Sequence, residues 1–304
     1  MSWFFIALIT PILHAVANHI DKHLISKYFK AGAVGSLVIF SSLFALIALP
    51  IIYFINPTIV GLGMPTTLYL IINGVLSLSY VIFYLYALEI DEASVVAPFF
   101  QMIPVFGFIL GYFILGETLV THQLYACAAI ILGGLLLSLN LQGGIRNITI
   151  KKKLLLLMFS SSFLYALNNV IFKFFAIDTG FSTSLFWNMV GQVLLGIILL
   201  VFVASYRKQF QTVIKDNTLA VLGLNFFNGL IILTGDIVFF FALLLAPVTL
   251  VFAVSGFQPF FVLIFGIILS LFFPNFGSES LERKVLIQKI IGIAFIVLGS
   301  IFLS

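Results

Sequence analysis

Long apolar runs follow one another along the chain, separated by short breaks of Gly, Pro, Asn or charged residues. Most runs reach the roughly 20 residues that a helix needs to cross a hydrocarbon core of about 30 Å. No run shows the strict alternation of a barrel strand, and open strands are costly in lipid because their backbone groups stay unpaired. The pattern therefore predicts an all-α integral membrane protein. Ten transmembrane helices are expected, over residues 3–20, 33–55, 66–88, 93–115, 121–140, 154–177, 182–205, 217–245, 247–273 and 286–303.

The two halves of the chain repeat each other. A shift of 155 residues, without gaps, brings four features of the first half onto four of the second: Asn73-Gly74, Ala87-Leu88, Pro104 and Gly111 onto Asn228-Gly229, Ala242-Leu243, Pro259 and Gly266. Each copy holds five predicted helices, an odd number, so the second copy enters the membrane from the opposite side. The sequence thus predicts two inverted five-helix repeats, over residues 1–140 and 154–304, joined by a basic loop over residues 141–153.

Composition excludes a soluble fold and several kinds of activity. The 304 residues are 62% hydrophobic and only 8% charged, against about 25% charged in soluble proteins. The longest polar interruptions are too short for a nucleotide-binding domain, and no phosphate-binding loop is present, so direct use of ATP is not expected. A single cysteine and four histidines give neither a disulfide nor a metal-ligand spacing. The chain is expected to be no enzyme and to need no cofactor.

Basic residues mark one face of the predicted bundle. Of the 14 Lys and Arg, 13 lie in four loops that open on the same face, residues 21–32, 141–153, 206–217 and 274–289, and the other is Lys173. By the positive-inside rule that face is cytoplasmic and both termini lie outside. Anionic lipid and topology explain the net charge of +4, so nucleic acid is not an expected partner.

Asp236 is the most unusual polar residue of the apolar runs. A carboxylate at the middle of a membrane helix costs about 2.5–3.5 kcal/mol, a cost that usually indicates function. At 100° per residue, Asn225, Asn228 and Asp236 share an arc of about 80°. We hypothesise that Asp236 accepts a proton or pairs with a cation, and that Asn228 faces the substrate. The alternative is a structural carboxylate bonded to another helix.

Two further polar ribbons run down helices that the duplication pairs. His14 and Asn18 share an arc of the first helix with Asp21 and Lys22, and the sixth helix carries Ser162, Tyr165, Asn169 and Lys173. Inverted repeats would bring the two ribbons together across a pseudo-twofold axis. We therefore expect His14, Asn18, Asn169 and Lys173 to line a cavity, although interhelix hydrogen bonds or snorkelling would also explain them.

The third helix adds a stripe of amides and hydroxyls at i, i+4, i+7 and i+11. Phenols beside amides suit an amphipathic organic solute, whereas the plainer interpretation is interhelix hydrogen bonding. The predicted substrate-binding residues of this and the remaining helices are Asn73, Ser77, Tyr80, Tyr84, Gln101, Trp187, Asn188 and Gln258.

Pro104 and Pro259 occupy equivalent positions of the two repeats. Each removes a backbone hydrogen bond and should kink its helix, so we assign both to architecture and gating. Glu117 follows the fourth helix, and we expect it to cap the start of the fifth.

These residues carry a family resemblance. The order and spacing of Tyr86-Ala87-Leu88, Ala93, Pro104, Gly116-Glu117, Gln123 and Gly133 resemble the EamA repeat of the drug/metabolite transporter superfamily. The resemblance implies a ten-helix secondary carrier of small organic solutes with a central cavity between its repeats. It also implies both termini inside, against the charge count. The second repeat departs from the pattern, because Phe272-Phe273-Pro274 replaces Gly116-Glu117.

We therefore expect a secondary active transporter, a multi-pass protein of the plasma membrane (the inner membrane in a bacterium), which moves a metabolite, an amino acid or a drug-like amphipath by alternating access. Proton coupling is a hypothesis. A lipid-head-group flippase on the same fold and a non-transporting sensor or scaffold stay open as alternatives. The expected partners are a small-molecule substrate, bilayer lipid and, under the hypothesis, protons. Substrate identity and oligomeric state stay open, a monomer among the options.

Overall fold

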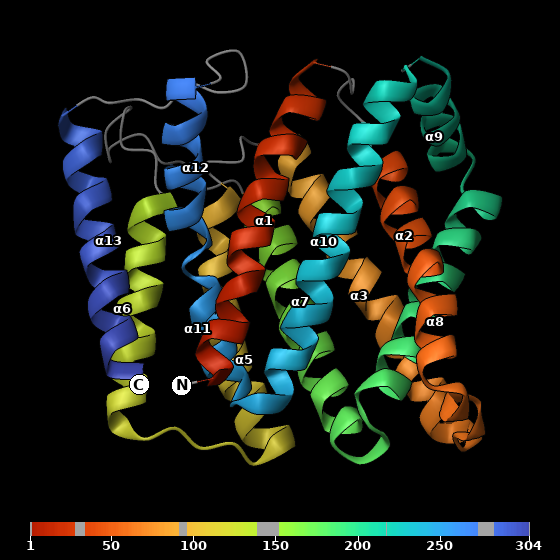
Figure 1. Ribbon diagram of the computed structural model, residues 1–304, viewed down its shortest axis with the longest axis horizontal. Coiled ribbons are helices and arrows are strands. Elements are labelled where there is room, and N and C mark those ends of the chain that lie inside the picture. The colour runs from red at the N-terminus through yellow and green to blue at the C-terminus, as the bar shows by residue number, and fades with distance from the viewer. Residues whose placement is uncertain are drawn as a thin grey trace.

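The computed structural model describes residues 2–27, 34–90, 96–138, 152–216, 218–272 and 283–303, and helices form all the regular structure of these residues (Figure 1). The predicted basic loop at 141–153 lies almost wholly outside them. The α-helices are α1 (Ser2–Lys27), α2 (Val34–Ile55), α3 (Met64–Ile90), α5 (Ile103–Leu110), α6 (Thr121–Ser138), α7 (Lys152–Thr179), α8 (Phe181–Phe202), α9 (Ala204–Asp216), α10 (Leu219–Leu245), α11 (Val248–Ser255), α12 (Gln258–Phe272) and α13 (Arg283–Leu303). Three shorter helical segments are η1 (Pro57–Gly61), η2 (Ala97–Met102) and η3 (Gly111–Leu115).

The helices form a multi-pass membrane bundle. Seven described stretches are long and apolar enough to cross a membrane, and three shorter apolar helices cover Phe99–Leu115, Thr121–Leu136 and Ile290–Gly299. Large apolar side chains cover the outside of the bundle, among them Phe54, Phe113 and Phe202, each more than three-quarters exposed. Such a surface is stable only against lipid.

The helices pair mainly across the two halves of the chain. The closest pairs are α6 with α13, α1 with α10, α3 with α7, α3 with α8 and α2 with α8, and each joins a helix before residue 140 to one after it. Both chain ends lie toward the lower edge of Figure 1, whereas α9 and the C-terminal ends of α1 and α12 lie at the upper edge. The core of the protein is therefore the seam between its halves.

Glycines permit the close crossing of α3 and α8. A methyl group at Gly74 of α3 would clash with Asn188 O and lie 2.9 Å from Gln192 N of α8. One at Gly191 would lie 2.9 Å from Gly74 Cα. The backbones of α3 and α8 thus touch directly, as in the small-residue packing common between membrane helices.

Two of the ten predicted helices are broken. The fourth consists of η2, α5 and η3, which are 3₁₀, α and π segments in turn, and Pro104 lies at the second residue of α5. The ninth stops at Ser255 and restarts as α12, with Pro259 at its second residue. Proline lacks the N–H that would continue the helix and clashes with the preceding turn, so both breaks fall at the predicted positions. The gating role of these prolines stays a prediction.

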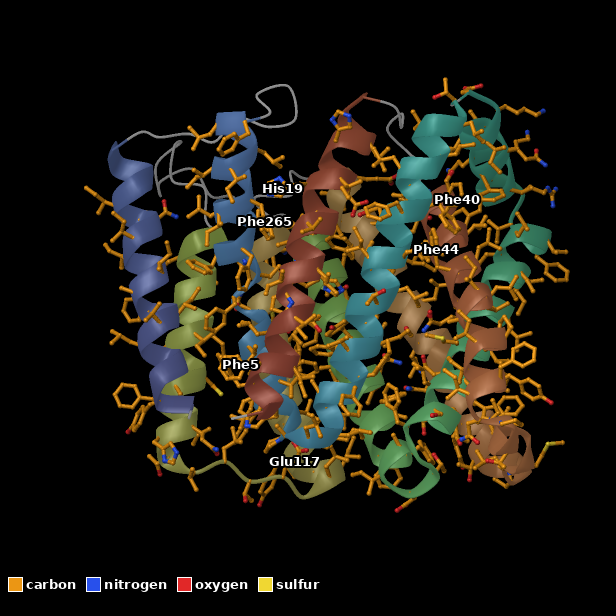
Figure 2. All side chains as sticks on the ribbon, viewed as in Figure 1. Phe5, His19, Phe40, Phe44, Glu117 and Phe265 are labelled. Carbon is orange, nitrogen blue, oxygen red and sulfur yellow. The ribbon has the colours of Figure 1, made fainter. Side chains whose placement is uncertain are left out.

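The helix α9 lies where the sequence pattern predicts a basic loop. Tyr206, Phe210 and Val213 form an apolar stripe that packs on the bundle, and Phe210 lies 4.9 Å from Phe40 of α2, ring centre to ring centre. Figure 2 shows Phe40 on α2 beneath this helix. Its basic residues, Arg207, Lys208 and Lys215, are exposed. An amphipathic helix therefore closes this corner of the upper face.

Candidate functional site

A polar cavity lies at the centre of the bundle, between α3, α7, α8 and α10. It offers about 30 Å³ of space to water-sized molecules, enough for a water or two. Its walls combine amides, hydroxyls, aromatic rings and one carboxylate. The lining residues are Ser77, Tyr80, Tyr165, Asn168, Asn169, Met189, Gln192, Leu233, Asp236, Phe239 and Phe240.

Aromatic rings form a continuous wall of this cavity. Tyr80 and Tyr165 meet edge to face with their centres 4.8 Å apart. Behind Tyr165, Phe239 and Phe252 stack at 5.8 Å. Edge-to-face and offset stacks are the favoured arrangements of aromatic pairs, so this wall is held in shape by its own packing.

His14 of α1 and Asp236 of α10 meet beside the cavity. His14 Nε2 lies 3.2 Å from Asp236 Oδ1, and the two side chains are 22% and 40% exposed. Glycine makes the approach possible, because a methyl group at Gly235 would lie 2.9 Å from the His14 ring. The structure thus brings together two residues that the sequence singled out on separate helices, and it leaves the carboxylate open to the cavity.

Asn73 is engaged in helix packing. Its Nδ2 donates to Asn168 O at 3.1 Å, and Asn168 Nδ2 donates to Asn73 O at 2.8 Å. This reciprocal pair ties α3 to α7, and both residues are buried. The position favours the interhelix interpretation of Asn73. Ser77 and Tyr80, one and two turns along the same stripe, face the cavity.

Asn168→Ala is expected to lower the free energy of unfolding by about 1 kcal/mol, because hydrogen bonds between membrane helices average about 0.6 kcal/mol and rarely exceed about 1.7 kcal/mol. Unfolding in a dodecyl sulfate titration would measure the change. The exposed Gln211→Ala is the matched control, and a loss at Asn168 no larger than at Gln211 would contradict a packing role.

Asn228 is likewise held by a neighbouring helix. Asn228 Nδ2 donates to Asp21 Oδ1 of α1 at 2.6 Å. The His14–Asp236 contact joins the same two helices about two turns away. Thr10 Oγ1 of α1 also donates to Gly235 O of α10, at 3.1 Å. Asn228 is buried and does not line the cavity. Its contact therefore fits the packing of α10 on α1.

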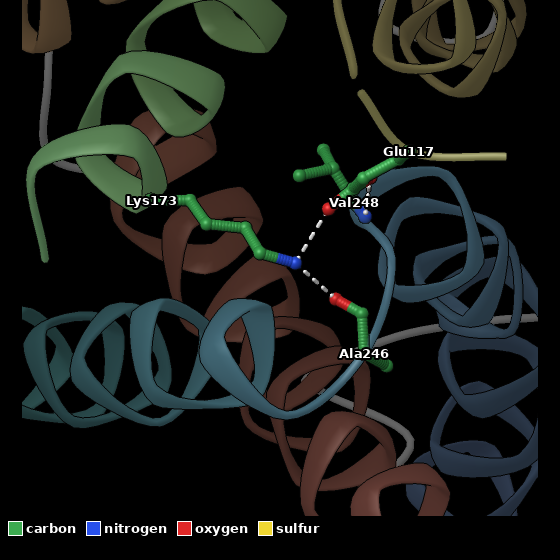
Figure 3. A network of polar contacts seen from close by, with 4 residues as sticks. All are labelled: Glu117, Lys173, Ala246 and Val248. Carbon is green, nitrogen blue, oxygen red and sulfur yellow. Dashed lines mark hydrogen bonds and ion pairs between the residues drawn. The ribbon is translucent and has the colours of Figure 1, made fainter. Parts of the chain in front are cut away.

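Lys173 forms an ion pair with Glu117 (Figure 3). Its Nζ lies 2.6 Å from Glu117 Oε1 and donates to Ala246 O, also at 2.6 Å. Glu117 Oε2 accepts from Val248 N at 2.7 Å. The ammonium therefore neutralises the C-terminal end of α10, and the carboxylate caps the N-terminal end of α11. Each charge is opposite to the dipole end that it meets.

The backbone around Glu117 explains its reach. Gly116 has φ of 67°, the left-handed conformation that ends a helix, and Glu117 N then donates to Gly111 O at 3.1 Å. This turn points the side chain across the bundle to α11 (Val248), not along the chain to α6. The expectation that Glu117 caps the following helix is therefore wrong: it caps α11 instead of α6. In Figure 2 Glu117 lies at the lower edge, on the side of the termini.

Of the next three predicted residues, two lie outside the cavity lining and one belongs to it. Trp187 Nε1 donates to Ile59 O at 3.0 Å and so anchors η1. Asn188 is buried and accepts from Gln192 Nε2 at 3.0 Å. Asn169, whose Nδ2 donates to Tyr165 O at 2.8 Å, does line the cavity.

The remaining four residues are away from the centre. Tyr84 packs on Phe100, with ring centres 5.0 Å apart, and Gln101 packs against Gly134 of α6. Asn18 is exposed, and Gln258 is partly exposed at the start of α12. These positions leave their substrate-binding role as a prediction.

Sequence reasoning missed Asn168, Phe239 and Phe240. Asn168 adjoins Asn169 in the sequence. Two consecutive amides on a membrane helix indicate that this turn has polar side chains in two directions. The two phenylalanines belong to a run of three. In a chain with 36 Phe such a run gives no warning that two of its rings line a polar cavity.

A separate apolar groove of about 310 Å³ lies against α1. Residues of α1, α10 and α12 line it, namely Val16, His19, Ile20, His23, Leu224, Phe265, Ile268 and Leu269. His19 Nε2 is bonded to Val262 O at 3.0 Å, and Figure 2 shows His19 beside Phe265. Apart from the two histidines the lining side chains are apolar, so the groove offers mainly hydrocarbon.

Comparisons with known proteins agree with a transporter fold. Residues 1–139 match the profile of the EamA-like transporter family. Eighteen chains of known structure resemble this one. A crystal structure described only as that of a protein aligns with a TM-score of 0.64 at 15% identity, over 100% of this chain and 97% of its own, a likeness that shows the fold alone. No curated protein matches the chain significantly.

Proposed function

Residues 1–139 match the EamA-like transporter family, and on the basis of that match we propose that the chain is a secondary active transporter, which moves a small organic solute across the membrane by alternating access. The observation that carries the proposal is the central cavity, where amides, phenols and Asp236 gather in the middle of membrane-crossing helices. Polar groups at that depth are costly, and a solute site is the use that fits them best.

We further infer that the chain comprises two inverted five-helix repeats, over residues 1–140 and 154–304. The pairing of helices supports this. The contact of α1 with α10 has its counterpart in the contact of α7 with α3, and the pairs α2–α8, α5–α11 and α6–α13 each join equivalent helices. A twofold relation in the membrane plane would produce this set of contacts. Such repeats can exchange conformations and open the site to either side.

Proton coupling through Asp236 is part of the proposal. Asp236→Asn is expected to abolish solute accumulation driven by a pH gradient and to leave exchange down a solute gradient, because the amide cannot carry the proton. The measurement is proton flux into proteoliposomes loaded with a pH-sensitive dye and challenged with pooled amino acids, nucleosides and amines.

Asp178→Asn is the matched control, because Asp178 is an exposed carboxylate on α7. Equal proton flux in wild type and Asp236→Asn would contradict proton coupling through Asp236. Loss of folding in Asp236→Asn would assign the carboxylate to structure. A counterflow assay with labelled solutes from each pool then tests transport itself, and no counterflow with folded wild-type protein would contradict the transporter.

The second candidate is a lipid-head-group flippase. The apolar groove against α1 favours it, because a flippase must hold an acyl chain in hydrocarbon while the head group crosses. Loss of a fluorescent head-group signal to an external quencher, in vesicles with and without the protein, separates the two functions.

We place the protein in the plasma membrane, or the inner membrane of a bacterium, with the face that carries α9 toward the cytoplasm. Arg207, Lys208 and Lys215 are exposed there, and basic residues concentrate on cytoplasmic faces. The termini would then lie outside. Labelling of a cysteine introduced at Ser2 by a membrane-impermeant reagent tests this orientation.

A further inference from the structure

We propose that the central cavity selects solutes that carry an organic ammonium group on an aromatic or apolar body. The inference rests on the proposed function, since it names the class of solute. It decides among the three solute classes pooled in the proton-flux assay, namely amino acids, nucleosides and amines.

Charge is the first argument. Asp236 is the one charged side chain among the described residues that line the cavity. The nearest lysine along α7, Lys173, is bonded to Glu117 and to Ala246 O, so its charge is already compensated. His14 Nε2 meets Asp236 Oδ1 from α1 at 3.2 Å, but His14 does not line the cavity, so the charge that faces a solute there is the carboxylate. A solute carboxylate would add a second negative charge to this site, whereas an ammonium would balance the first.

The aromatic wall is the second argument. Tyr80, Tyr165, Phe239 and Phe240 line the same cavity as Asp236, and the first two rings stand at 89° to each other. A cation over the face of such rings is attracted by the negative face of each ring, and several rings around one charge form the aromatic cage typical of ammonium sites. Neutral solutes gain less from this geometry, because the attraction acts on charge.

Size and hydrogen bonding fit the same ligand. About 30 Å³ of space admits an ammonium head group, while the body of the solute needs the opening that alternating access supplies. Ser77, Asn169 and Gln192, which line the same cavity, offer oxygen atoms to the N–H groups. We infer that the site recognises the ammonium head group and accepts different apolar or aromatic bodies.

The test compares three probes of nearly equal shape: 3-phenylpropylammonium, 3-phenylpropionate and 3-phenyl-1-propanol. Binding to the purified protein in detergent is measured by titration calorimetry. The ammonium probe is expected to bind about tenfold or more tightly than the other two, which corresponds to about 1.4 kcal/mol. In Asp236→Asn the preference is expected to fall below about twofold.

A second set of variants keeps the inference testable if Asp236→Asn does not fold. Tyr80→Leu removes the ring and is expected to weaken ammonium binding more than Tyr80→Phe, which keeps it. Tyr125→Leu is the matched control, since Tyr125 is 73% exposed on α6. Equal effects of all three changes would contradict the aromatic cage.

The outcomes distinguish failure of the ammonium site from failure of the proposed transport function. If the acid or the alcohol binds as tightly as the ammonium probe, the inference is overturned, and counterflow of either compound would still support transport. If the ammonium probe binds selectively but shows no counterflow in proteoliposomes, the transporter is contradicted and the ammonium site stands.

Discussion

Lys173→Met lowers the free energy of unfolding by about 3–5 kcal/mol, we expect, because it leaves the Glu117 carboxylate buried without its counter-charge. The side chains of the pair are only 9% and 14% exposed. The variant also frees Ala246 O, which Lys173 Nζ holds at 2.6 Å. A dodecyl sulfate titration followed by tryptophan fluorescence measures the loss, since Trp187 reports on the bundle around α8.

The double variant Lys173→Met/Glu117→Gln separates the cost of a lone charge from the value of the pair. It should regain much of the stability, because no uncompensated charge stays buried and the amide oxygen of the introduced glutamine can still accept from Val248 N. Lys215→Met, at an exposed lysine, is the control for loss of a positive charge. A Lys173→Met protein as stable as the Lys215→Met protein would show that this ion pair does not hold the helices together.

A single methyl group at Gly74 is expected to cost about 1–3 kcal/mol. Gly74→Ala places its Cβ against the Asn188 carbonyl oxygen and 2.9 Å from Gln192 N, both backbone atoms of α8. Backbone cannot rotate away as a flexible side chain can, so α3 and α8 must separate. The same detergent titration gives the magnitude, and Gly191→Ala, across the same crossing, should behave alike.

Gly223→Ala is the control for the change in residue type. Gly223 lies in α10, and nothing approaches the position of its added methyl within 4 Å. Alanine there is expected to match or slightly exceed the wild-type stability, because it favours the helix by up to about 1 kcal/mol. If Gly74→Ala and Gly223→Ala gave the same stability, the close crossing of α3 and α8 would be wrong.

Local pattern predicted most of the helices, and the differences have physical causes. Apolar runs fix where a chain can lie in lipid, but they do not say where a helix changes its hydrogen-bond register, so the 3₁₀ and π segments around Pro104 were not foreseen. The helix α9 was missed because its composition is too polar for a membrane span. The spacing of Tyr206, Phe210 and Val213 did carry the signal of an amphipathic helix.

The sequence predicts which polar residues form the candidate site better than it predicts which partners they bond. Asp236, Tyr80 and Asn169 were chosen because polar groups are costly in lipid, and all three line the cavity. Which partner each polar group meets depends on the rotation of whole helices, which one sequence does not determine. That is why Glu117 reaches Val248 and Asn73 reaches Asn168, neither of which the sequence suggested.

The pairing of helices across the two halves has a consequence for how the protein is made. The ribosome delivers α1, α2, α3 and α6 to the membrane before α7, α8, α10 and α13, against which they pack, have been synthesised. Asn73 therefore has no hydrogen-bond partner in Asn168 until α7 is made, and Gly74 has no α8 to pack against. Most of the packing in the bundle is therefore a late event, which waits until the second half of the chain has entered the bilayer.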